Sequence, residues 1–91
     1  MRVRVERSGG FAGVVVRGEA DTADLDDEQA AQLRDLAGRV DLEALTATAP
    51  SPGRADRFRY DVEVDGCRVE LGETAVPAEL RSLIDHVLRR R

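Results

Sequence analysis

The protein has 91 residues, of which 42% are hydrophobic and 35% are charged, and its formal net charge is -4. Because a chain of this length buries only about 60 to 70% of its unfolded surface, we expect a single domain over residues 1–91 with one hydrophobic core. The acidic balance excludes proteins that hold phosphate backbones through a basic surface, so nucleic acid is not an expected partner.

The first expected element is a β-hairpin over residues 2–17. Charged residues and valines alternate with period two over residues 2–7, which predicts a half-buried strand. The segment Ser8–Gly13 holds three glycines, which gives the backbone enough freedom to reverse its direction. The β-branched run Val14–Arg17 then predicts the second strand.

A helix is expected after this hairpin. Asp26 is suited to be its N-cap, with Gln29 as the capping-box partner, and apolar residues follow at helical spacing as far as Gly38. A short turn is expected over residues 41–45. Residues 46–56 contain two prolines and a glycine without apolar periodicity, so they predict a surface connection.

The second hairpin has the strongest local signal. Apolar and charged residues alternate over Phe58–Val64 and again over Cys67–Leu71, and the two runs are joined by Asp65-Gly66, a pair that favours a two-residue hairpin turn. Pro77 then fits the first turn of a helix. The apolar residues of this last helix recur at its 3.6-residue period: Leu80, Leu83, Ile84, Val87 and Leu88.

The element order ββαββα predicts an α+β fold. We expect one mostly antiparallel four-stranded sheet with two helices packed on one face and charged side chains on the other. The order of the four strands stays open. The two periodicities predict a shared core of Phe58, Tyr60, Val62, Val69, Leu80, Ile84 and Val87.

The chain carries no residues in a pattern that predicts catalysis, so we do not expect an enzyme. Cys67 is the only cysteine and His86 the only histidine, which excludes a disulfide and a cysteine-histidine zinc site, and we expect no metal and no cofactor. We expect Cys67 to be a small core residue and His86 to be a surface histidine. Four aspartates lack the spacing of a calcium loop and are better explained by capping and solvation: Asp21, Asp24, Asp26 and Asp27.

The first residues and the longest apolar runs indicate where the protein works. Residues 1–7 alternate charge and valine where a signal peptide would need an unbroken apolar run, and no stretch has membrane-spanning length. We therefore expect a cytoplasmic protein with no membrane partner.

The glycine-rich turn is the candidate partner-binding site, and it consists of Ser8, Gly9, Gly10, Phe11, Ala12 and Gly13. A phosphate cradle is disfavoured because this segment joins two strands and does not lead into a helix. A glycine turn has no need of an aromatic residue, so Phe11 at its tip is a candidate anchor for a partner's pocket. The alternative, in which Phe11 folds back onto its own core, stays open.

Four groups of residues carry a family resemblance. They are Glu6-Arg7-Ser8-Gly9-Gly10-Phe11-Ala12-Gly13 followed by valines, then Asp21, Leu25, Glu28, Ala30 and Leu33, then Phe58-x-Tyr60-x-Val62, and last Val76-Pro77-x-Glu79-Leu80-Arg81-x-Leu83. In these the chain resembles the emfourins, small protein inhibitors of protealysin and related thermolysin-like zinc metallopeptidases. Cys67 and Gly18 match no feature of that family.

The resemblance implies a protein partner, a thermolysin-like zinc metallopeptidase that supplies the zinc while this chain blocks its active-site cleft. It also implies that Phe11 mimics the bulky apolar side chain that such enzymes favour next to the scissile bond. The alternative function is a non-inhibitory interaction or regulatory module that uses the outer face of the sheet. Opposite charges alternate on that face: Arg2, Arg4, Arg57, Arg59 and Arg68 with Glu6, Asp61, Glu63 and Glu70. Ordinary solvation explains such a face equally well, because exposed ion pairs contribute only about 0 to 1 kcal/mol each.

Overall fold

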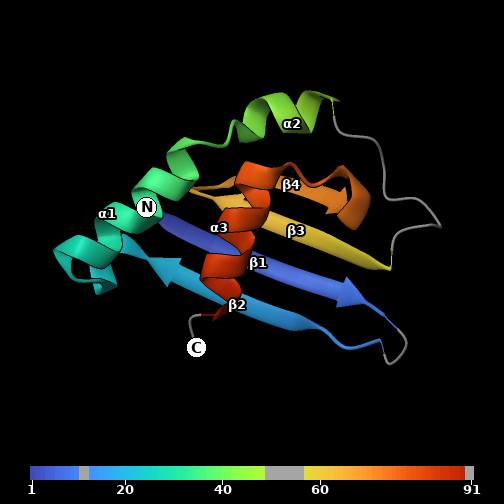
Figure 1. Cartoon of the computed structure of the whole chain (residues 1–91), viewed down its shortest axis with the longest axis horizontal. Coiled ribbons are helices and arrows are strands. Elements are labelled where there is room, and N and C mark those ends of the chain that lie inside the picture. The colour runs from blue at the N-terminus through green and yellow to red at the C-terminus, as the bar shows by residue number, and fades with distance from the viewer. Residues whose placement is uncertain (11–12, 49–56, 90–91) are drawn as a thin grey trace.

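The computed structural model describes residues 1–10, 13–48 and 57–89 (Figure 1). Its elements in chain order are β1 (Arg2–Gly9), β2 (Val16–Asp21), the 3-10 helix η1 (Thr22–Asp24), α1 (Asp27–Gly38), α2 (Leu42–Thr48), β3 (Phe58–Val64), β4 (Cys67–Gly72), the 3-10 helix η2 (Glu73–Ala75) and α3 (Ala78–Arg89). None of the helices in these described ranges is long and apolar enough to cross a membrane.

The four strands form one sheet in the order β2-β1-β3-β4, and every neighbouring pair is antiparallel. Helix α3 crosses one face of the sheet against β1 and β2, and α1 packs beside α3 (Figure 1). Helix α2 lies along β4, where the Thr46 hydroxyl donates a hydrogen bond to the backbone carbonyl of Arg68, 3.4 Å away. The predicted α+β fold is confirmed, and the strand order that the sequence left open is settled.

The core lies between the sheet and α3. The apolar residues that alternate along the strands and those that recur along α3 face it. Val3 and Val5 of β1 face this layer and are buried opposite Val64 and Val62 of β3. The predicted core residues are buried except Phe58, which is half-buried at the end of β3 and packs against the core from its margin. The fully buried large side chains are Leu33, Leu71, Leu80, Leu83, Ile84, Val3, Val5, Val62 and Val87.

The hairpin turn at Asp65-Gly66 is confirmed. Asp65 has φ 48° and Gly66 has φ 87°, the two positive values that a type I′ turn requires. The Asp65 carboxylate also accepts a hydrogen bond of 2.8 Å from the backbone N–H of Arg2. This bond ties the second hairpin to the first strand.

Aspartates cap the N-termini of α1 and α2, and only the cap of α1 was predicted. The Asp26 carboxylate accepts a 2.7 Å hydrogen bond from the backbone N–H of Gln29, and α1 ends at Gly38, as expected. The turn expected over residues 41–45 is wrong, because Asp41 caps a second helix, α2, by accepting a 3.0 Å bond from the N–H of Ala44. The first three residues of the expected surface connection, residues 46–48, belong to α2. Residues 49–56 lie outside the described part of the chain.

Helix α3 packs closely on β2 at Gly18. A Cβ on this residue would lie 2.8 Å from the carbonyl oxygen of Val87, so only glycine lets the helix pack at this depth. The strand itself begins at Val16, two residues later than predicted, because Val14 and Val15 do not pair with β1.

The only cysteine and the only histidine of the sequence were predicted with different success. Cys67 is half-buried and packs against the edge of the core, in agreement with its predicted role. The prediction of a surface histidine at His86 is wrong, because its Nε2 is buried and has no hydrogen-bond partner among the described residues. His86 follows the buried Leu83 by three positions on α3, which turns it toward the packed side of the helix.

Candidate functional site

The glycine-rich turn joins the end of β1 to β2, at the end of the sheet away from α1 (Figure 1). Ser8 and Gly9 still belong to β1 and pair with Arg59 and Phe58 of β3. Phe11 and Ala12, two of the six predicted site residues, lie outside the described residues. The structure therefore defines the two arms of the turn.

The first arm is fixed to the beginning of β3. Gly9 has φ 107°, and a Cβ on it would overlap the carbonyl oxygen of Arg57. Gly10 has φ 83° and donates its backbone N–H to the same carbonyl over 2.9 Å, while a Cβ on it would lie 3.1 Å from the Phe58 ring. Both positions need glycine, because a side chain has neither the backbone conformation nor the space.

The second arm is held less tightly. The Gly13 N–H donates to the carbonyl of Gly10 over 3.3 Å, which connects the two arms. Gly13 has φ 61°, but nothing lies within 4 Å of the place that a Cβ would take. The three glycines thus serve different purposes: close packing at the first two and backbone conformation alone at the third.

Val14 and Val15 follow the turn and are exposed, with relative accessibilities of 57% and 46%. Apart from Met1, they are the exposed large hydrophobic residues of the described chain. The sequence placed both valines in the second strand and missed them as candidate binding residues. A signal was present, because three consecutive valines cannot all face the buried side of a strand whose side chains alternate.

Two arginines cover aromatic rings on the inner face of this end of the sheet. The Arg7 guanidinium lies 5.0 Å from the centre of the Phe58 ring, and that of Arg81 lies 5.9 Å from the Tyr60 ring. Arg81 also donates to the backbone carbonyl of Glu73 over 3.2 Å. Arg81 belongs to α3, so its contact adds to the packing of this helix on β3, whereas the Arg7 contact lies within the sheet, between β1 and β3.

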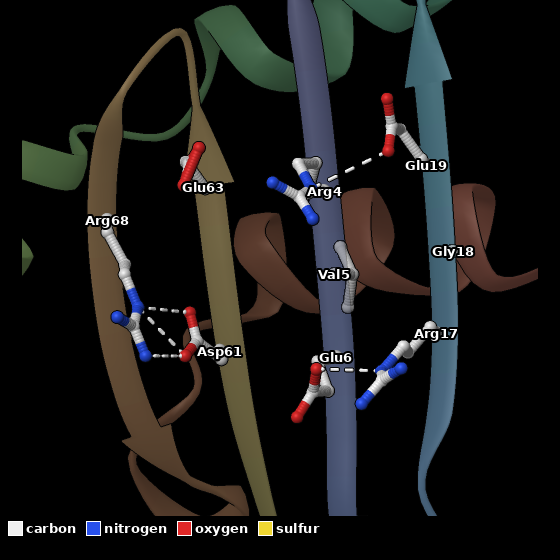
Figure 2. A pocket seen from close by; sticks show the side chains of 9 residues that line it. All are labelled: Arg4, Val5, Glu6, Arg17, Gly18, Glu19, Asp61, Glu63 and Arg68. Carbon is white, nitrogen blue, oxygen red and sulfur yellow. Dashed lines mark hydrogen bonds and ion pairs between the residues drawn. The ribbon is translucent and has the colours of Figure 1, made fainter.

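The charged outer face of the sheet forms a shallow hollow of about 470 Å³ (Figure 2). In Figure 2 its arginines point toward carboxylates of neighbouring strands: Arg17 Nε donates to Glu6 over 3.0 Å, and Arg68 contacts Asp61 through two nitrogens. The pKa of Arg68 is raised, first by its hydrogen bond to Asp61 and then by the charge of that carboxylate. Because these charges satisfy one another, the face is well explained as a solvated surface.

The described residues contain no group of three or more histidine, cysteine or acidic side chains that could hold a metal ion.

One family model matches most of the chain. The model described as Emfourin matches residues 5–88, a range that begins within β1 and ends within α3. No curated protein and no solved structure gives a significant match. Emfourins are an inhibitor family, which implies a protease as the protein partner. Since the match covers nearly the whole chain, this protein belongs to the Emfourin family.

Proposed function

We propose that this protein inhibits a thermolysin-like, protealysin-like zinc metallopeptidase by binding in its active-site cleft and blocking it. The observation that carries the proposal is the family match over residues 5–88. The peptidase supplies the zinc, and this chain supplies a surface that keeps substrate away from it.

The turn from Ser8 to Gly13 is the proposed contact. Its first arm is fixed by the hydrogen bond from Gly10 to the Arg57 carbonyl and by the pairing of Gly9 with Phe58. A segment already held in one conformation loses little conformational entropy on binding, so more of its contact energy appears as affinity. Glycines also let a partner's backbone approach closely.

The same rigidity supports resistance to cleavage. Hydrolysis requires the scissile carbonyl to reach a near-attack geometry at the zinc-bound water, and small displacements lower the rate steeply. A turn that closes on itself through the bond from Gly13 to Gly10 cannot relax into an extended substrate conformation without breaking that bond. We therefore expect the bound turn to be cleaved slowly or not at all.

Titration of a thermolysin-like peptidase with the purified protein tests the proposal. We expect the peptidase activity to fall to zero at one inhibitor per active site. The apparent inhibition constant should rise with substrate concentration, because inhibitor and substrate compete for the cleft. A serine protease should keep its activity. Excess zinc should not restore activity, because the protein does not act by chelation. A peptidase that keeps full activity at saturating protein would contradict the proposal and would favour the interaction module on the outer face of the sheet.

A further inference from the structure

The end of the sheet that bears the glycine turn combines exposed apolar area with positive charge. We call this surface the tip and define it by the described residues 7–10, 13–16 and 57–59 together with Glu73 and Arg81. Val14 and Val15 form its apolar part, and nothing in the described chain covers them. Exposed apolar side chains beside a turn that has one arm fixed to the sheet are typical of a binding surface.

The charge of the tip is opposite to that of the whole protein. Its charged members are four arginines and one glutamate, whereas the chain carries a net charge of -4. The Arg57 side chain is 81% exposed, and its Nε lies 3.8 Å from a carboxylate oxygen of Glu73. Arg7 and Arg59 form no ion pair with any described residue, and Arg7 is stacked on Phe58.

Negative charge is concentrated at the other end of the molecule. Asp21, at the end of β2, and Asp26, at the beginning of α1, lie at the end of the sheet remote from the turn (Figure 1). In the row of the sheet next to the tip, Glu6 and Asp61 are each paired with an arginine from the outer face. Within the part of the chain that the structure describes, the tip therefore keeps its positive charge without an unpaired acidic cluster beside it.

From this we infer that the tip binds through Val14 and Val15 as its apolar centre, and that it fits a peptidase cleft in which an apolar side-chain pocket is bordered by carboxylates. The inference rests on the proposed function and names the chemistry of the surface that the inhibitor recognises. Carboxylates are favoured because Arg7 and Arg59 would lose water on docking, and an opposite charge with hydrogen-bond acceptors compensates best for that loss.

The apolar part is tested with Val14→Ser and Val15→Ser, measured as inhibition constants against the same peptidase. Both side chains are exposed, so unfolding midpoints should stay those of the wild type. Loss of a buried valine contact should weaken inhibition about tenfold or more, mainly through faster dissociation. The matched control is Ala31→Ser, an exposed position on α1 at the other end of the molecule, which should leave inhibition unchanged.

The charged part is tested with Arg59→Gln, measured as the association rate at low and high ionic strength. We expect association to slow about twofold to fivefold at low salt and the difference to vanish near 1 M salt, where charges are screened over about 3 Å. Arg39→Gln makes the same charge change just after α1, where Arg39 is paired with Asp35 at 2.9 Å, and should leave the association rate near that of the wild type.

The outcomes separate the inference from the proposed function. A wild-type protein that inhibits no thermolysin-like peptidase would overturn both. A wild-type inhibitor whose two valine variants match Ala31→Ser in potency would overturn the apolar centre. Equal association rates for Arg59→Gln and Arg39→Gln at low salt would overturn the acidic border of the cleft.

Discussion

At the scale of single residues, Gly9 and Gly13 show that the same amino acid is needed for different reasons within one turn. Both have positive φ, but a Cβ on Gly9 would overlap the carbonyl of Arg57, whereas a Cβ on Gly13 would meet nothing within 4 Å. The sequence identified both as turn residues. It could not rank them, because the obstacle to a side chain at Gly9 comes from a residue 48 positions later in the chain.

We expect Gly9→Ala to destabilise the protein by about 1 to 3 kcal/mol from backbone strain alone, with a further loss from the overlap. Gly13→Ala should cost about 1 kcal/mol, since only its left-handed backbone conformation is disfavoured. Denaturant unfolding of both variants measures the difference. Equal losses for the two variants would show that the turn is not fixed to β3 as described.

Phe11→Ala tests the anchor that the sequence predicts for the glycine turn. If Phe11 is the anchor, inhibition should weaken by about 2 to 4 kcal/mol, or roughly thirtyfold to a thousandfold, while the melting temperature is unchanged. If Phe11 folds onto the core, stability should fall by about 3 to 5 kcal/mol and inhibition should be lost with folding. Unchanged potency in a folded variant would contradict the anchor and would leave Val14 and Val15 as the apolar contact of the turn region.

At the scale of secondary-structure elements, strands and hairpins were predictable from alternation and turn chemistry, and the errors occurred where tertiary contacts decide. Asp41 caps α2, but its signal was hidden by the short apolar pattern that follows. β2 begins at Val16 because pairing with β1 stops at Arg7, and only the register between the strands reveals that. The burial of His86 Nε2 depends on how α3 packs against its neighbours, although the three-residue spacing of His86 from the apolar Leu83 was a sign of it in the sequence.

Gly18→Ala tests the packing of α3 on β2. The added Cβ would lie 2.8 Å from the Val87 carbonyl and has to push the helix outward, so we expect a loss of about 1 to 3 kcal/mol in the free energy of unfolding. Gly38→Ala is the matched control, because nothing lies within 4 Å there and alanine favours the helix by up to about 1 kcal/mol. A Gly18→Ala protein as stable as the wild type would contradict the close contact.

At the scale of the whole molecule, the fold was predictable and the candidate site only in part. Four alternating strands and two apolar helical stripes leave few ways to build one core, so fold class and most core residues followed from the sequence. The glycine turn was found by composition. The exposure of Val14 and Val15 and the positive tip were not, because both depend on which residues from distant segments meet at one end of the sheet.

Metal removal is the corresponding whole-molecule prediction. The described residues offer no metal-binding group, and the core is apolar, so a strong chelator should leave the melting temperature unchanged. The measurement is thermal unfolding with and without the chelator at fixed ionic strength. A lower melting temperature in the chelator would show that a metal ion contributes to the folded state.

The two edges of the sheet are unequal, and this limits how copies of the protein can join. Helix α2 lies along β4, while no described strand or helix pairs with the outer edge of β2. Two open β2 edges can pair around a two-fold axis, and the resulting pair presents only its α2-covered sides. In the language of polymer chemistry, each copy then offers one reactive end among its described strands, so pairing through β2 joins two copies and leaves no second β2 edge for a third.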